Sequence, residues 1–144
     1  MKVADLIQSR KDVYSIQDQD TVHDAARYLR DRGVRAVGVR DASGKVVGVV
    51  SQSDVSDKVA AENKPPAWMR VSEIMSTNLV TAHMETPIEE CRQLMDKHGI
   101  FHLVVMDEKG EYRGMISVTD LLKVMAMDQK ARADMLESYI YPQR

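Results

Sequence analysis

Hydrophobic residues follow two spacings along the chain, and the two spacings alternate in a fixed order. Residues 22–29 carry apolar side chains three and four positions apart, which is typical of one face of a helix. A short strand is expected at 13–16, and the apolar runs 34–39 and 46–50 are typical of buried strands. A second helix is expected from about Asp54 to Glu62. The pattern therefore predicts strand, helix, strand, strand and helix.

The same pattern returns 66 positions later, without a gap from Val13 onwards. Upstream, Val3–Ile7 corresponds to Val71–Met75, after which the first copy has two extra residues. We divide the chain into repeat 1 (1–62), a linker (63–70) with the Pro-Pro pair, and repeat 2 (71–144) with an extended last helix. The matching residues are Gly33 with Gly99, Asp41 with Asp107, Gly44 with Gly110, Gly48 with Gly114, Ser51 with Ser117 and Asp54 with Asp120.

Glycines mark the ends of elements in both repeats. Gly33 and Gly99 are expected to end the first helices as C-terminal caps, and the turns DASG and DEKG are expected to close hairpins. Each repeat is too small for a stable core of its own. We therefore predict an α/β fold of the α+β type, in which the two repeats pack as one module with a pseudo-two-fold axis.

Composition excludes several classes of partner. The 20 Lys and Arg residues against 22 Asp and Glu residues give a net charge of −2, without the basic excess of a nucleic-acid-binding protein. The N-terminus has no long apolar stretch, so we expect no signal peptide, no membrane helix and a cytoplasmic location.

The single cysteine, Cys91, is expected in the core. The last helix favours a dimer, because it carries the apolar residues Leu121, Leu122, Val124, Met125, Met135, Leu136 and Ile140.

Two signatures, Gly48–Asp54 (GVVSQSD) and Gly114–Asp120 (GMISVTD), follow the hairpins. Together with the Asp-x-x-Gly turns they resemble the cystathionine-β-synthase (CBS) domain family, whose tandem repeats form a Bateman module. The resemblance covers nearly the whole chain. It implies a module that binds AMP, ADP, ATP, S-adenosylmethionine or NAD and signals to a regulated partner protein, commonly as a homodimer. We expect no enzyme activity and no fused enzyme, because the repeats account for the chain.

The signatures also have a physical interpretation of their own. Ser51 and Ser117 lie near helix N-termini, where free backbone donors and the helix dipole favour phosphate. Three residues later, Asp54 and Asp120 each offer two acceptor oxygens, spaced to receive both hydroxyls of a ribose. The same Ser-x-x-Asp spacing fits a capping box, in which the side chains satisfy backbone donors. Both interpretations stay open.

The resemblance assigns apolar walls for adenine and a cation for phosphate. Adenine would also contact the backbone at 13–16 and 79–82. The cation is expected six residues before the hairpin aspartate, which is Arg35 in repeat 1 but Phe101, followed by His102, in repeat 2. The two sites are therefore unequal. The candidate ligand-binding residues are Ile16, Ala82, Val49 and Met115 for the base, Arg35 and His102 for phosphate, and Ser51, Ser53, Asp54, Ser117, Thr119 and Asp120 from the signatures.

Other interpretations have weaker support. The motifs of serine hydrolases, zinc proteases and dinucleotide- or phosphate-binding loops do not occur. His98 and His102 are four residues apart, but Gly99 interrupts the helix, so no metal is expected. Phe101 is most simply a core residue. The leading hypothesis is a stand-alone regulatory module with an adenine nucleotide between its repeats. The alternative is a ligand-free dimerising adaptor, favoured by Phe101 in place of a cation and by the polar Gln52.

Overall fold

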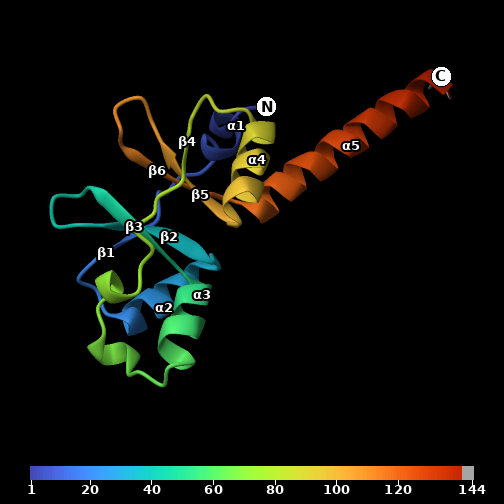
Figure 1. Cartoon of the computed structure of the whole chain (residues 1–144). Helices are drawn as coiled ribbons and strands as arrows, with labels where there is room; N and C mark the ends of the chain where they lie inside the picture. Colours follow the sequence, from blue (N-terminus) through green and yellow to red (C-terminus); the bar gives the residue numbers. More distant parts are fainter. Residues whose placement is uncertain (141–144) are drawn as a thin grey trace.

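Two three-stranded sheets, one in each repeat, form the centre of the computed structural model (Figure 1). The structure describes residues 1–140, without the side chains of residues 131, 132, 135, 136 and 138–140. Repeat 1 contains α1 (Val3–Ile7), β1 (Ser15–Gln17), α2 (Val22–Arg32), β2 (Ala36–Arg40), β3 (Val46–Ser51), α3 (Gln52–Val55) and the π-helix η1 (Ser56–Ala60). The 3₁₀ helices η2 (Pro66–Trp68) and η3 (Val71–Glu73) follow, and then β4 (Thr81–His83), α4 (Ile88–His98), β5 (His102–Met106), β6 (Tyr112–Ser117) and α5 (Val118–Ile140).

The predicted order of strand, helix, strand, strand and helix is confirmed in both repeats. In each sheet the first two strands are parallel and joined by a helix, and the last two form an antiparallel hairpin. The last helix begins at Gln52 in repeat 1 and at Val118 in repeat 2, two residues before the predicted starts, because the preceding serine caps it. Gly33 and Gly99 end α2 and α4 in the left-handed conformation, as predicted.

Each repeat completes the hydrophobic core of the other. Helix α1 lies beside α4 of repeat 2 (Figure 1), and the N–H groups of Val3 and Ala4 donate to carbonyls of repeat 2 at 2.9 and 2.8 Å. Val3 and Ile7 are buried in the core of repeat 2. In return, Val71 and Ile74 are buried in the core of repeat 1. The chain therefore crosses between the repeats twice, through segment 8–14 and through segment 75–80.

Tyr112 holds the two sheets together at their interface. Its hydroxyl accepts from the Gly38 N–H at 3.0 Å and donates to the Tyr14 carbonyl at 3.0 Å. A Cβ atom on Gly38 would lie 2.6 Å from the Tyr112 ring, so glycine is required there. At the equivalent place in repeat 2, the Val104 N–H donates directly to the Val80 carbonyl at 3.1 Å. Tyr112 therefore breaks the symmetry of the repeats, and burial raises the pKa of its hydroxyl to about 12.

Helix α5 leaves the body of repeat 2 and projects beyond it (Figure 1). Leu121 is buried, but Leu122 and Met127 are 59% and 71% exposed. The predicted apolar residues Met135, Leu136 and Ile140 lie outside the described side chains. Within residues 1–140, no helix is both long and apolar enough to cross a membrane.

The Tyr112 bridge makes a prediction about stability. Tyr112→Phe removes the hydroxyl and leaves a buried N–H and a carbonyl without their partner, which costs about 1–3 kcal/mol of unfolding free energy. Urea unfolding measures this loss. Tyr14→Phe is the matched control, because the Tyr14 hydroxyl forms no hydrogen bond within the described residues. Equal stabilities for the two variants would contradict the bridging role.

Candidate functional site

A cleft of about 1210 Å³ lies between the two repeats and is lined by both. We call the part around Asp54 the repeat 1 end and the part around Asp120 the repeat 2 end. The candidate residues that line the cleft are Arg35, Val49, Ser51, Ser53, Asp54, His102, Met115, Ser117, Thr119 and Asp120. The fold therefore brings together side chains from both signatures and from the starts of β2 and β5.

Ile16 and Ala82 lie elsewhere. Ile16 is 5% exposed in the core of repeat 1, and Ala82 is 2% exposed in the core of repeat 2. Each is the middle residue of a three-residue strand, so its side chain points to the face opposite its neighbours. Neither residue lines the cleft, and their assignment to the adenine wall stays a prediction. Val49 and Met115, both half-buried, remain as apolar lining.

At the repeat 1 end, the Ser51–Asp54 pair forms the capping box of α3. The Ser51 hydroxyl accepts from the Asp54 N–H at 3.3 Å, and Asp54 Oδ2 accepts from the Ser51 N–H at 2.9 Å. The other oxygen, Oδ1, forms an ion pair with Lys58 at 2.9 Å, one helical turn away. Lys58 is not among the residues that line the cleft. The capping interpretation is therefore confirmed here, and the carboxylate is fixed at the cleft wall.

At the repeat 2 end, Asp120 makes the same cap but has a different cation. Its Oδ2 accepts from the Ser117 N–H at 2.8 Å, and its own N–H donates to the Ser117 hydroxyl at 3.2 Å. Oδ2 also binds the guanidinium of Arg10 at 3.0 Å, and the same guanidinium donates to the Met115 carbonyl. Within the described residues, Oδ1 of Asp120 has no hydrogen-bond partner. One carboxylate oxygen therefore serves the helix cap, and the other remains available.

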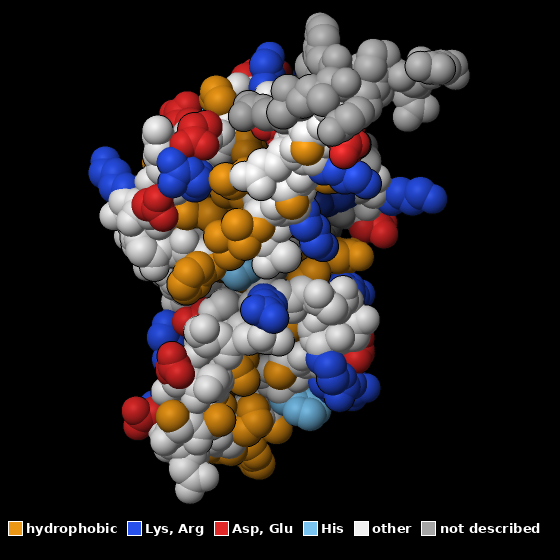
Figure 2. Space-filling model, turned by 90° about the vertical axis from the view of Figure 1, so that its right-hand side faces the viewer, with side chains coloured by type: hydrophobic (Ala, Val, Ile, Leu, Met, Phe, Trp, Pro, Cys, Tyr) orange, Lys and Arg blue, Asp and Glu red, His pale blue; other side chains and the backbone are white. Residues whose placement is uncertain are grey.

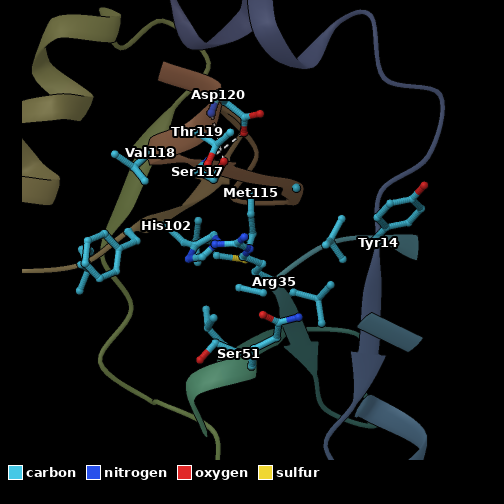
Figure 3. A pocket seen from close by; sticks show the side chains of 18 of the residues that line it. Tyr14, Arg35, Ser51, His102, Met115, Ser117, Val118, Thr119 and Asp120 are labelled. Atoms are coloured by element: carbon cyan, nitrogen blue, oxygen red, sulfur yellow. Dashed lines mark hydrogen bonds between the residues drawn. The ribbon is translucent and has the colours of Figure 1, made fainter. Parts of the chain in front are cut away.

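Two basic side chains meet in the middle of the cleft, between the two signatures (Figure 3). Arg35 is exposed just before β2, and His102 is half-buried at the start of β5. Burial lowers the pKa of His102 and the nearby Arg35 lowers it further, whereas Asp120 acts in the opposite direction. These surroundings therefore favour the neutral imidazole.

Further cations line the same cleft. Arg10, Lys11, Arg113 and Lys123 join Arg35, against the carboxylates Asp12, Asp54 and Asp120. This balance favours an anionic ligand.

Phe101 is not a core residue as predicted, because it is 68% exposed at the cleft. Phe101 lies between Gly99 and the start of β5. Its carbonyl accepts a hydrogen bond from the Val118 N–H at 2.9 Å. It therefore leaves the position equivalent to Arg35 without a cation. His102, the next residue, supplies the basic group instead.

Sequence reasoning missed two residues that shape the cleft. Arg10 lies in the segment where repeat 1 has two extra residues, and this length difference was the available signal. Tyr112 matches Val46 of repeat 1, but its contact with Gly38 spans the two repeats and leaves no local pattern. The Tyr14 carbonyl, expected to face adenine, already accepts from Tyr112.

The family model for the CBS domain matches residues 3–61 and 71–127. This chain belongs to the CBS domain family. A signal-transduction protein with CBS domains from Burkholderia ambifaria is 29% identical, with a TM-score of 0.82 over 90% of this chain and 96% of its own. A CBS domain pair, that of protein MJ0100, was solved in complex with 5′-methylthioadenosine and S-adenosyl-L-methionine. It is 25% identical, with a TM-score of 0.77 over 87% of this chain and 99% of its own.

Curated relatives are longer than this chain. The chain is 26% identical to a protein from Methanopyrus kandleri, over 81% of its own length and 59% of that protein. Relatives also include inosine-5′-monophosphate dehydrogenase from Methanocaldococcus jannaschii, of which the chain spans 23%. CBS repeats like these therefore occur within full-length enzymes as well as in small proteins.

The described part of the CBS pair contains neither a metal-binding group of side chains nor an exposed cysteine. Residues 1–140 contain no group of three or more His, Cys, Asp or Glu side chains that could hold a metal ion. Cys91 is fully buried, as predicted, and burial raises the pKa of its thiol to about 11.

The His102 environment makes a prediction about titration. The imidazole should titrate below the ordinary value of 6.5, and Arg35→Met should shift its midpoint upward, because a neighbouring positive charge is lost. NMR of the ring protons measures both midpoints, with His102→Gln as the assignment control. Arg35→Lys keeps the charge and should leave the midpoint nearly unchanged. A midpoint that Arg35→Met does not move would contradict the charge contact.

Proposed function

We propose that this CBS pair is a regulatory module that binds adenosine-containing ligands such as AMP, ADP or ATP in the cleft between its repeats. The observation that carries the proposal is one cleft lined by both signatures, Asp54 and Asp120 included. Arg35 and His102 lie between Ser51 of one signature and Asp120 of the other (Figure 3). The related pair solved with 5′-methylthioadenosine and S-adenosyl-L-methionine supports the ligand class.

The carboxylates are suited to a ribose. Each is held rigidly by its helix cap, so little rotamer entropy remains to be lost when a ligand binds. Asp120 Oδ1 can accept a hydroxyl directly, whereas Asp54 Oδ1 is shared with Lys58. A hydrogen bond from a hydroxyl to a carboxylate contributes about 1.5–3 kcal/mol. Ser53 and Thr119, exposed beside the carboxylates, add hydroxyl groups to the same walls.

The basic side chains are suited to phosphate. Arg35 offers a planar guanidinium that suits a phosphate, and a phosphate beside His102 favours the protonated imidazole. AMP, ADP and ATP offer this anion. S-adenosylmethionine and NAD share the adenosine part, so the same carboxylates would hold them. Adenine would lie against Val49 or Met115.

The position of the cleft between the repeats would let a bound ligand change how the repeats pack. Both crossing segments, 8–14 and 75–80, contribute residues to it, so a ligand that prefers one arrangement of the repeats shifts their packing. We propose that the exposed apolar side chains Phe101, Leu122 and Met127 take part in a homodimer and in contact with a regulated partner protein. Figure 2 shows hydrophobic side chains gathered beside Lys and Arg on one face. We place this module in the cytoplasm, without a nucleic-acid partner.

A second candidate is a ligand-free dimerising adaptor without enzyme activity. Two observations favour it: both carboxylates already serve helix caps, and Phe101 occupies the position of a cation. The two candidates differ in their response to nucleotides.

A panel of AMP, ADP, ATP, S-adenosylmethionine, 5′-methylthioadenosine and NAD tests the proposal by thermal unfolding and calorimetry. A ligand that binds only the folded chain at 100 times its Kd stabilises it by about 2.7 kcal/mol and raises its Tm. We expect Asp54→Asn and Asp120→Asn to reduce the shift, because each keeps an acceptor for the cap but loses the charge. Asp57→Asn, outside this cleft, should leave the shift intact.

The ribose contact has its own control within the same panel. Adenosine ligands without the 2′-hydroxyl should bind about tenfold more weakly or worse, because one charge-assisted hydrogen bond is lost. If no compound raises the Tm while the chain sediments as a dimer, the adaptor function replaces the regulatory one.

A further inference from the structure

The two ends of the cleft are built from equivalent residues but are occupied differently. At the repeat 1 end, Ser76 and Val49 exchange two backbone hydrogen bonds of 2.8 and 2.9 Å. At the repeat 2 end the equivalent positions are Arg10, 66 positions before Ser76, and Met115, 66 positions after Val49. There the contact is made by the Arg10 side chain, which donates to the Met115 carbonyl and reaches on to Asp120.

Arg10 therefore contacts both residues that a nucleoside would use at the repeat 2 end, through the Met115 carbonyl and Asp120 Oδ2. Met115 is the apolar lining beside the base, and Asp120 is the acceptor for the ribose. The guanidinium lies within the cleft itself, since Arg10 is one of its lining residues. The cation at the other end is different, because Lys58, which pairs with Asp54 Oδ1, is not among the residues that line the cleft.

We infer that Arg10 is a built-in competitor of the ligand: its guanidinium lies against Asp120 and the Met115 carbonyl inside the cleft, so a nucleoside must displace it to occupy the repeat 2 end. This inference rests on the proposed function of the cleft. The ion pair is partly exposed, with side-chain exposures of 35% for Arg10 and 29% for Asp120. Such a pair is weak, so a ligand can displace it.

Displacement of Arg10 would alter the position of a segment that contacts both repeats. Arg10 lies in segment 8–14, which joins α1, packed on repeat 2, to β1, paired within repeat 1. Tyr14, four residues later, holds Tyr112 at the interface of the two sheets. Occupation of the repeat 2 end therefore changes the segment that connects the repeats, whereas occupation of the repeat 1 end leaves it in place.

The test uses 5′-methylthioadenosine. Because this nucleoside is uncharged, a change in the net charge of the protein does not by itself alter its affinity. Asp54→Asn is the common background, so that the repeat 2 end dominates binding. Arg10→Ala should tighten the calorimetric Kd about two- to fivefold, the factor that corresponds to a partly exposed ion pair. Arg10→Lys keeps the charge and should remain near the parent value.

Arg27→Ala is the matched control. Arg27 is the same residue type on the exposed side of α2, but it does not line the cleft and forms no ion pair within the described part of the chain. Its removal should leave the Kd unchanged. Far-ultraviolet circular dichroism and Tm establish that each variant is folded.

A salt series on the Asp54→Asn parent needs no change at Arg10. Raising NaCl screens the Arg10–Asp120 pair, so affinity for the uncharged nucleoside should rise with salt in the parent and not in Arg10→Ala. If the parent binds the nucleoside and folded Arg10→Ala binds it no more tightly, the inference is wrong but the proposed function stands. Absence of binding in every chain, the unmodified one included, would overturn the proposed function and the inference with it.

Discussion

The exchange of short helical segments between the repeats is the constraint on which the remaining structure depends, because neither hydrophobic core is complete without residues of the other repeat. Val3 and Ile7 fill the core of repeat 2, and Val71 and Ile74 fill that of repeat 1. The two crossing segments must therefore pass between the sheets, where they border the cleft. A change in the cleft reaches both cores through covalently continuous chain.

The signatures serve the fold and the cleft with different atoms of one side chain. In both repeats the aspartate uses Oδ2 for the helix cap and presents its carboxylate at the cleft wall. Capping and ligand binding are thus compatible interpretations of the same Ser-x-x-Asp spacing. The cap fixes the carboxylate at the cleft wall, where we propose that a ribose hydroxyl binds, and this rigidity would lower the entropic cost of binding.

Much of this arrangement could be predicted from the sequence, because it depends on local pattern. The 66-residue repeat, the glycine caps at Gly33 and Gly99, and the hairpins follow from spacing and turn chemistry. Contacts between distant segments could not be predicted in this way. The Arg10–Asp120 pair joins residues 110 positions apart, and the burial of Ile16 was not evident because a three-residue strand does not reveal which face is buried.

The central claim is that one cleft between the CBS repeats holds adenosine through Asp54 or Asp120 and phosphate through Arg35 and His102. A crystal structure of the chain grown with saturating AMP tests it most directly. The account predicts ribose hydroxyls on one of the two carboxylates and the phosphate between the arginine and the histidine. AMP bound outside the cleft, or a cleft without AMP under these conditions, would contradict the account.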